Sequence, residues 1–259
     1  MILDEILEEK KRAVSTARFR LPLADLEKRA TSAPPVRSLS YALRTANGMA
    51  CIAEFKRRSP SKGWIRKDAD PVVITKAYEA AGAAALSVLT DTPFFGGTLD
   101  DLRKVRENVA IPILRKDFVI DPYQVVEARA AGADAVLLIV SALDDARLGE
   151  LLAEVEHFGM EALVETHDAK EVERALAIGA RIIGVNHRDL RTFTMNMDLA
   201  ISLRPQVPPD RVLVAESGLH TFGDVARMGH GGINAILVGE SLMRAEDPGA
   251  ALRMLLGDD

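Results

Sequence analysis

Eight short runs of apolar residues alternate along the chain with longer stretches in which apolar and polar positions mix. The runs are rich in Val, Ile, Leu and Ala and lie at residues 49–55, 84–90, 111–114, 135–140, 162–165, 181–186, 212–215 and 235–238. Continuous apolar runs of this kind are typical of strands that are buried on both faces of a parallel sheet. Helix candidates lie between them, for example 70–81 and 121–131 (each beginning Asp-Pro), 143–158, 168–178 and 221–228. The alternation therefore predicts an α/β fold with a parallel sheet.

A repeated glycine extends this prediction. The strings around Gly82, Gly132, Gly179 and Gly232 resemble one another, and these glycines lie about 50 residues apart. Each one follows a predicted helix and precedes a predicted strand, a place where glycine commonly ends a helix. Eight strands, with a repeat of two strand–helix units, favour a (β/α)8 TIM barrel over residues 49–259. The alternative is an open doubly wound sheet, but Gly-x-Gly-x-x-Gly is missing after the first strand.

Residues 1–48 precede the first strand and do not fit the repeat. Apolar positions at helical spacing begin with Leu3 and Ile6, and Pro34 and Pro35 separate this pattern from a second, shorter one. We therefore expect an N-terminal helical extension of two or three helices that pack on the barrel. They could cap the barrel or cover its mouth, and the pattern is as compatible with a packing role as with a catalytic one.

The composition is that of a globular protein. Of 259 residues, 48% are hydrophobic and 27% charged, and the formal net charge is −5. This balance gives no reason to expect a nucleic acid partner. No apolar run approaches the length of about 18 residues that a membrane span needs, and the N-terminus does not resemble a signal peptide. The lone Cys51 cannot form an internal disulfide, so we expect a cytoplasmic protein, either a monomer or a weak homo-oligomer.

Charged and polar residues follow most of the predicted strands. In TIM barrels the residues after the carboxyl ends of the strands form the active site. Here they are Glu54, Lys56, Lys116, Glu165, Asn186, Arg188, Glu216, Ser217 and Glu240. We expect Lys116 to pair with Glu54, and Glu165 to lie near Glu216. A lysine beside another lysine would have a lowered pKa, and carboxylates that share a site would have raised pKa values, which suits proton transfer near neutral pH.

The last two of these loops have the form of a phosphate-binding site. Ser217-Gly218 and Gly239-Glu240 place small residues where backbone N–H groups can approach an anion, and a short helix is predicted after the second loop. Lys56 could supply a cation. We expect the Glu240 side chain to point away from the phosphate while its N–H takes part. Either loop alone could be a structural turn, but the two together favour phosphate binding.

The sequence indicates neither a metal site nor a hydrolase. The five histidines lack the spacing His-x-x-x-His, and Cys51 has no partner, so we predict no metal. His167 and His187 follow predicted strands, and we expect them to be solvent-exposed or to support neighbouring site residues. Gly-x-Ser-x-Gly is also missing, so no nucleophilic serine is indicated.

Several motifs resemble those of the indole-3-glycerol phosphate synthase family. They are Ala-Glu-Phe-Lys-Arg-Arg-Ser-Pro-Ser at 53–61, Val-Leu-Thr-Asp at 88–91, Phe-Phe-Gly-Gly at 94–97, Leu-Arg-Lys-Asp-Phe at 114–118, Leu-Val-Glu at 163–165, Gly-Val-Asn-His-Arg-Asp-Leu at 184–190, Ala-Glu-Ser-Gly at 215–218 and Val-Gly-Glu-Ser-Leu-Met at 238–243. The resemblance covers essentially the whole chain, and the first motif is highly specific. His187 departs from the pattern, because a second Asn is common there.

The resemblance implies a TIM barrel enzyme that needs no cofactor. Its reaction would convert 1-(2-carboxyphenylamino)-1-deoxyribulose 5-phosphate to indole-3-glycerol phosphate, with loss of carbon dioxide and water. Lys116 resembles the general acid that protonates the ribulose carbonyl during ring closure. Glu165 would handle the protons of the later dehydration, with Lys56 as an alternative acid.

The same resemblance implies how the substrate would be held. Glu54 and Asn186 would orient Lys116 and the substrate hydroxyls, while Glu216 and Ser217 would complete the polar floor. Arg188 would bind the anthranilate carboxylate. The aromatic ring would lie on an apolar shelf of Pro60, Phe95, Phe118, Leu137, Leu190 and Leu237. The phosphate would be bound by Lys56, Ser59 and the N–H groups around Gly218 and Gly239.

Two other classes of protein remain open at this point. Another phosphate-binding barrel enzyme, such as phosphoribosylanthranilate isomerase, would share the last two loops but should lack Lys56, Lys116 and Glu165. A non-catalytic barrel, kept as a subunit or used as an engineered scaffold, would share every motif without turnover. The partner predicted for the chain is a small phosphorylated molecule. Because that substrate also carries a carboxylate, we expect the mouth of the barrel to be locally basic.

Overall fold

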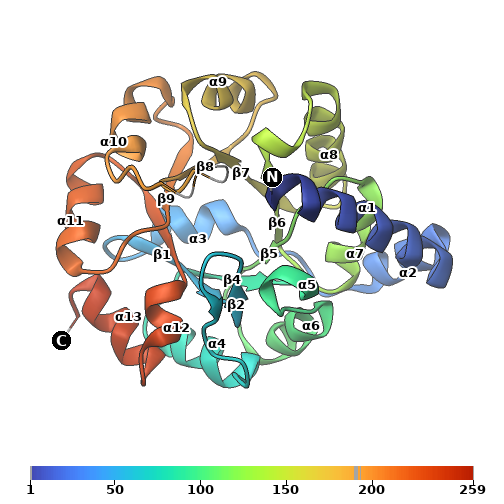
Figure 1. Cartoon of the computed structure of the whole chain (residues 1–259), viewed down its shortest axis with the longest axis horizontal. Helices are drawn as coiled ribbons and strands as arrows, with labels where there is room; N and C mark the ends of the chain where they lie inside the picture. The colour runs from blue at the N-terminus through green and yellow to red at the C-terminus, as the bar shows by residue number, and fades with distance from the viewer. Residues whose placement is uncertain (1, 190–191, 193, 259) are drawn as a thin grey trace.

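The computed structural model describes residues 2–189, 192 and 194–258. These residues form a closed barrel of eight parallel strands surrounded by helices (Figure 1). Its strands are β1 (Ala50–Phe55), β4 (Ala85–Leu89), β5 (Ile113–Lys116), β6 (Ala135–Ile139), β7 (Glu161–Thr166), β8 (Ile182–Asn186), β9 (Val212–Glu216) and β10 (Ala235–Val238). Strand β1 pairs with both β4 and β10, which closes the barrel. The predicted (β/α)8 architecture is confirmed, and every strand overlaps its predicted apolar run.

The segments that follow the strands carry the helices around the barrel. They are α4 (Pro71–Ala80), α5 (Thr92–Phe95), α6 (Leu99–Asn108), α7 (Pro122–Ala130), α8 (Asp145–His157), α9 (Ala169–Ala177), α10 (Leu199–Leu203), α11 (Phe222–His230), α12 (Glu240–Arg244) and α13 (Pro248–Leu256), with 3-10 turns η1 (Val140–Ala142) and η2 (Arg204–Gln206). The side chain of Asp70 accepts hydrogen bonds from the first N–H groups of α4, and Asp121 does the same for α7. The two Asp-Pro pairs therefore begin helices, as the sequence predicts.

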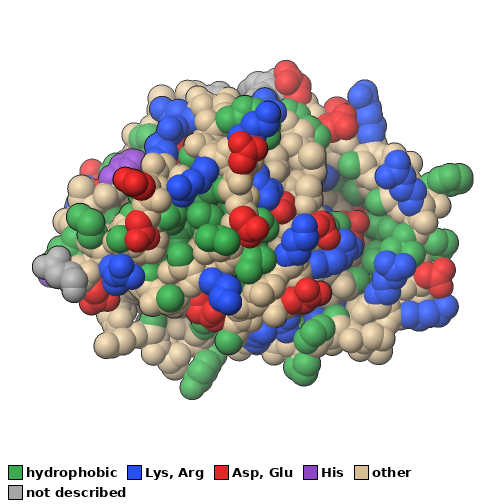
Figure 2. Space-filling view, turned by 90° about the horizontal axis from the view of Figure 1, so that it is seen from below, with side chains coloured by type: hydrophobic (Ala, Val, Ile, Leu, Met, Phe, Trp, Pro, Cys, Tyr) green, Lys and Arg blue, Asp and Glu red, His purple; other side chains and the backbone are tan. Residues whose placement is uncertain are grey.

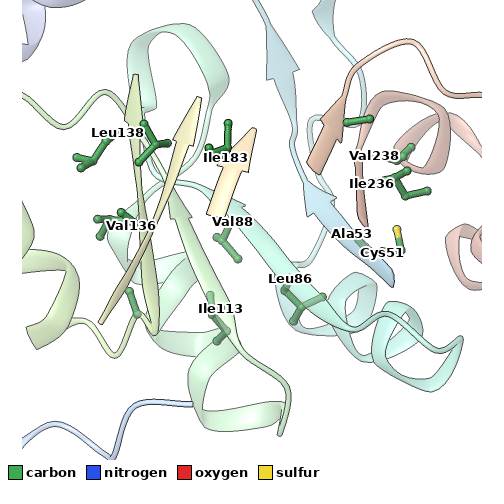
Figure 3. Packing of buried hydrophobic residues seen from close by; sticks show 14 of the residues in the cluster. Cys51, Ala53, Leu86, Val88, Ile113, Val136, Leu138, Ile183, Ile236 and Val238 are labelled. Atoms are coloured by element: carbon green, nitrogen blue, oxygen red, sulfur yellow. The ribbon is translucent and has the colours of Figure 1, made fainter. Parts of the chain in front are cut away.

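Alternate residues of the strands build two separate cores. Ile52, Leu114 and Leu163 belong to the core inside the barrel. Neighbouring positions such as Cys51 and Ile113 pack instead in the core between the strands and the outer helices (Figure 3). Because both faces of each strand are buried, the strands appear in the sequence as unbroken apolar runs rather than as alternating ones.

The four glycines of the repeat all adopt the left-handed backbone conformation. Gly82, Gly132, Gly179 and Gly232 have φ angles of 89°, 91°, 87° and 76°. Each lies just beyond the end of a helix, where a residue with a Cβ atom would be strained. This agrees with the helix-ending role that the repeat predicts.

Three helices precede the barrel: α1 (Ile2–Arg20), α2 (Leu23–Ser32) and α3 (Leu39–Thr45). Leu39 and Leu43 of α3 join the core inside the barrel, at the N-terminal ends of the strands. Helix α1 lies at the opposite end, nearer the viewer in Figure 1, while α2 packs on α7. The hydroxyl of Tyr123 on α7 lies 3.1 Å and 3.0 Å from the carbonyl oxygens of Ala17 and Leu21. The N-terminal helices therefore contact both ends of the barrel.

A small antiparallel hairpin follows β1, and the sequence pattern does not predict it. Its strands are β2 (Arg58–Ser59) and β3 (Gly63–Trp64). Two-residue strands are too short to produce a periodic pattern of apolar and polar positions. The hairpin matters for function because it brings Ser59 and Pro60 to the mouth of the barrel.

The surface carries charges of both signs. Figure 2 shows Lys and Arg side chains interspersed with Asp and Glu over one side of the molecule. Large exposed apolar side chains include Phe19, Tyr41, Val73 and Met254, which come from different helices. Among the residues that the structure describes, no helix has both the length and the apolar character needed to cross a membrane.

Candidate active site

A cavity lies at the C-terminal ends of the barrel strands. Every predicted site residue that falls within the described part of the chain lines it: Glu54, Lys56, Ser59, Pro60, Phe95, Lys116, Phe118, Leu137, Glu165, Asn186, Arg188, Glu216, Ser217, Gly218, Leu237, Gly239 and Glu240. Leu190 lies outside the described residues. Strands that are distant in the sequence therefore bring the predicted set together at one end of the barrel.

Lys116, the last residue of β5, is the buried cation of the cavity. Its Nζ lies 3.1 Å from Oε2 of Glu165 and 3.7 Å from Oε2 of Glu216. Burial disfavours the charged form, but the carboxylates of Glu165 and Glu216 outweigh it and raise the pKa of Lys116 above its usual range. The sequence-based expectation of a lowered lysine pKa is therefore wrong, because the ammonium group faces carboxylates rather than another lysine.

The expected pairing of Lys116 with Glu54 is also wrong. Glu54 pairs with Lys56 instead, and its Oε1 lies 2.6 Å from Nζ of Lys56. Both residues come from the end of β1 and are two positions apart, so their side chains point to the same side of the strand. Ser87 of the adjacent strand β4 adds a long hydrogen bond of 3.4 Å to Glu54. The ion pairs in the cavity therefore include Glu54 with Lys56 and Glu165 with Lys116.

The pKa values of Glu165 and Glu216 shift in opposite directions. Burial favours a neutral Glu165, but Lys116 and His167 outweigh it and lower the pKa of Glu165. Burial and repulsion by Glu165 raise the pKa of Glu216 well above its usual value. The amide of Asn186 donates a hydrogen bond of 3.2 Å to Oε1 of Glu165. The expectation that carboxylates sharing a site have raised pKa values therefore holds for Glu216. It is wrong for Glu165, which contacts the cations Lys116 and His167.

The two loops at the end of the barrel have unusual backbone geometry. Ser217 and Gly218 both have positive φ angles, 71° and 78°. Among the described residues, Ser217 is the one residue other than glycine that has a positive φ angle. The ring Nδ1 of His187 lies 3.0 Å from the carbonyl oxygen of Ser217. A Cβ atom at Gly239 would lie 2.6 Å from Oε1 of Glu54, so a side chain there would displace Glu54. Strain and close packing at these loops indicate a constrained binding surface.

Helix α12 begins at Glu240, directly after Gly239. The carboxylate of Glu240 is 3.1 Å from Nη2 of Arg244, one turn along the same helix. That ion pair neutralises the one acid in this loop that would repel an anion.

Apolar side chains form one wall of the cavity. The rings of Phe95 and Phe118 have centroids 6.2 Å apart, and Leu137 and Leu237 lie on the same cavity. Helix α1 adds Leu3 and Ile6 to the cavity lining. These two residues were not among the predicted site residues. Their place in the apolar stripe of residues 1–48 was visible, but a helical stripe does not say which surface it covers.

Within the described residues, the expected excess of basic residues at the mouth is not observed. The cations Lys56, Lys116 and Arg188 share the cavity lining with more numerous carboxylates, among them Asp91 and Asp117. Most of these carboxylates have a cationic partner. The charge at the mouth is therefore neutralised locally, within individual ion pairs. Within the described residues, no group of three or more His, Cys, Asp or Glu side chains is arranged to hold a metal ion.

Comparison with known proteins gives a uniform result. The sequence model of the indole-3-glycerol phosphate synthase family matches residues 3–255. Similar curated proteins of that name include one from Albidiferax ferrireducens, 48% identical over 98% of this chain and 97% of that protein. Others come from Polaromonas sp., 48% identical over 100% and 99% of the two chains, and from Rhodopirellula baltica, 46% identical over 98% of each. The chain belongs to the indole-3-glycerol phosphate synthase family.

One buried ionic cluster in this member of the indole-3-glycerol phosphate synthase family was not predicted. Lys10 of α1 places Nζ 2.8 Å from Oδ2 of Asp91 and 2.7 Å from Oδ1 of Asp117. Arg115 also contacts Asp117, at 3.1 Å. Burial alone would raise the pKa of Asp117, but Lys10 and Arg115 lower it to about 2. No spacing in the sequence relates residue 10 to residues 91 and 117, so only the fold reveals this contact.

Of the two histidines at the strand ends, His187 is buried and His167 is half-buried, so neither is solvent-exposed. Nε2 of His167 lies 3.3 Å from Oε1 of Glu165, and its Nδ1 lies 3.1 Å from Oε2 of Glu171. His187 contacts the Ser217 carbonyl, and burial lowers the pKa of its imidazole. Of the two alternatives that the sequence left open, the structure favours support of neighbouring site residues.

Proposed function

We propose that this chain closes the indole ring of 1-(2-carboxyphenylamino)-1-deoxyribulose 5-phosphate and releases indole-3-glycerol phosphate, carbon dioxide and water. The observation that carries the proposal is the ammonium group of Lys116, held 3.1 Å from the carboxylate of Glu165 inside a cavity with apolar walls. An acid and a base in contact are what a sequence of protonation and deprotonation steps requires. Family membership independently supports the same activity.

Ring closure depends on Lys116. As the ring carbon that bears the carboxylate attacks the ribulose carbonyl, a carbon–carbon bond forms and the carbonyl oxygen takes a proton from the ammonium group. The raised pKa of Lys116 keeps that proton in place at neutral pH. An alkoxide is more basic than an amine, so the transfer is favourable once negative charge develops on the oxygen. The carbon–carboxylate bond then breaks, and its electron pair neutralises the cationic ring as carbon dioxide departs.

The dehydration step depends on Glu165. The hydroxyl group formed by ring closure leaves as water, with a proton from Lys56 or from the reprotonated Lys116. Glu165 removes the proton whose loss makes the indole aromatic. The lowered pKa of Glu165 means that the carboxylate is ionised at neutral pH and able to accept this proton. Nearby carboxylates also stabilise the cationic intermediates of both steps electrostatically.

Substrate binding divides between three parts of the cavity. Lys56, Ser59 and the N–H groups around Gly218 and Gly239 bind the phosphate. Arg188, whose backbone N–H donates to the Asn186 side chain at 3.0 Å, binds the carboxylate that is lost. The anthranilate ring lies on the apolar wall that includes Phe95 and Phe118. Glu54, Asn186, Glu216 and Ser217 orient Lys116 and the substrate hydroxyls.

The setting that we propose is the cytoplasm, with the protein acting as a monomer or a weak homo-oligomer. The thiol of Cys51 is fully buried, and burial raises its pKa to about 12, so it is kept from thiolate chemistry. The site chemistry given above needs no nucleic acid, membrane or cofactor.

Turnover of the purified chain tests this proposal. The chain is incubated with the carboxyphenylamino-ribulose phosphate, and the rise of indole fluorescence is followed. We expect a continuous increase that scales with enzyme concentration, together with equimolar carbon dioxide. Absence of product at micromolar enzyme would contradict the proposed function and would favour a non-catalytic barrel.

A further inference from the structure

The geometry points to His167 as a positioning residue that fixes both the orientation and the charge of the Glu165 carboxylate. This inference rests on the proposed function, in which Glu165 accepts a proton during dehydration. His167 does not line the cavity and contacts the reacting groups only through Glu165.

The His167 imidazole bridges two carboxylates from different elements. Its Nε2 is 3.3 Å from Oε1 of Glu165 at the end of β7, and its Nδ1 is 3.1 Å from Oε2 of Glu171 in the first turn of α9. Lys116 approaches the other oxygen of Glu165, Oε2, at 3.1 Å. With a cation on each oxygen, the plane of the Glu165 carboxylate is fixed between β5 and the start of α9.

Both neighbours of His167 favour the imidazolium form. Burial opposes this charge, but the hydrogen bonds and charges of Glu165 and Glu171 raise the pKa of His167 to about 10. The other groups that face Glu165 are Lys116 from β5, Asn186 from β8 and Glu216 from β9. Lys116 and His167 are the cations among these groups, and both contribute to the lowered pKa of Glu165.

The imidazole is not needed to hold the local backbone. The backbone N–H of His167 donates a hydrogen bond of 2.8 Å to Glu171, and Asp168 caps α9 through the N–H of Glu171. Thr166 donates from its hydroxyl to the carbonyl oxygen of Gly184, which ties β7 to β8. A change of the His167 side chain that leaves these bonds intact should therefore affect Glu165 rather than the fold.

Two amide variants separate the functions of the ring. In His167→Gln the side-chain amide can reach the place of Nε2 and contact Glu165, but it carries no charge. In His167→Asn the shorter amide reaches only the place of Nδ1, beside Glu171. His157→Gln, on the exposed end of α8, is the matched control. The readouts are kcat, KM and the pH profile of kcat/KM in the indole fluorescence assay, with the thermal unfolding midpoint as a check on the fold.

We expect both His167 variants to move the acid limb of the kcat/KM profile upward by at least about one pH unit, because loss of the imidazolium raises the pKa of Glu165. We expect kcat to fall about tenfold in His167→Gln and about a hundredfold in His167→Asn, with KM within about threefold of the unmodified chain. His157→Gln should match the unmodified chain in every readout.

An acid limb that stays in place in both variants would overturn the inference, as would equal kcat values for Gln and Asn. The unmodified chain, measured alongside, separates this result from the broader proposal. If it forms no product, the proposed function has failed. If it turns over normally while the His167 variants behave like His157→Gln, only the role given to His167 has failed.

Discussion

Glu165 and Glu216 approach the same ammonium group, yet the pKa of Glu165 is lowered and that of Glu216 is raised. The difference lies in their other neighbours. Glu165 also contacts the Asn186 amide and the His167 imidazole, whereas Oε1 of Glu216 is buried and has no hydrogen-bond partner among the described residues. Two carboxylates in one buried site rarely both ionise, and unequal neighbours decide which one does.

The split between these carboxylates predicts unequal effects of removing each charge. Burial and Glu165 raise the pKa of Glu216, so Glu216→Gln puts a neutral amide of the same shape in place of the carboxyl group that ionises less readily, and we expect kcat to fall less than about tenfold. Glu165→Gln removes the base itself, and we expect a loss of about 10² to 10⁴ in kcat. Steady-state kinetics of the two variants at neutral pH measure the difference. A larger loss for Glu216→Gln than for Glu165→Gln would show that the charge assignment is reversed.

Among the elements, α1 is joined to the barrel mouth by charge as well as by apolar contact. Lys10 is about 10% exposed and contacts two aspartates that are almost fully buried, Asp91 after β4 and Asp117 after β5. Asp117 directly follows Lys116, so the same cluster that anchors α1 also holds the chain next to the proposed general acid. Leu3 and Ile6 of this helix lie on the cavity.

Removal of the Lys10 charge should therefore destabilise the protein. Lys10→Met leaves Asp91 and Asp117 buried with fewer cations, and breaking a buried ion pair in this way costs about 3 to 5 kcal/mol. Denaturant unfolding measures the change. The control is Lys11→Met, which removes an exposed lysine that pairs with Glu8 and should change the free energy of unfolding by less than about 1 kcal/mol. Equal unfolding midpoints for the two variants would contradict the role given to Lys10.

The strands and helices could be predicted because each residue of a buried strand carries the same apolar signal, and because Asp-Pro and glycine mark the helix ends. The location of the site followed from the barrel, since parallel strands bring their carboxyl ends together. The partners of Lys116 could not be predicted. Strand order places Glu54 and Glu165 on the same rim, but only the register and side-chain reach decide that Lys116 meets Glu165 and Glu216. For the same reason, no pattern related Lys10 to Asp117.

On the scale of the whole molecule, the N-terminal helices contact opposite ends of the barrel. Helix α1 lies beside the cavity, while α3 inserts Leu39 and Leu43, which are 0% and 3% exposed, into the core inside the barrel. The segment before the first strand therefore contacts the cavity at one end of the barrel and the apolar core at the other. The boundary predicted at residue 48 stays a prediction, because α3 is continuous with the barrel core.

Two deletions test how the extension contributes. Loss of residues 1–32 removes α1 and α2 but keeps α3, and we expect a folded barrel with a lower unfolding midpoint and reduced turnover. Loss of residues 1–48 also uncovers the surface beneath Leu39 and Leu43, each of which contributes about 1.5 to 3 kcal/mol by burial. We expect this longer deletion to unfold or aggregate. Circular dichroism and gel filtration measure the folding and the aggregation of both deletion variants. Equal stability of the two variants would show that α3 is not part of the folding unit.

The central claim is that the Lys116 ammonium group supplies the proton for ring closure. The most direct test is the steady-state turnover of Lys116→Ala with the carboxyphenylamino-ribulose phosphate, followed by indole fluorescence beside the unmodified chain. We expect kcat to fall at least about a thousandfold, with substrate affinity within about tenfold, because the phosphate and carboxylate contacts remain. Near-native kcat in Lys116→Ala would show that another group supplies this proton.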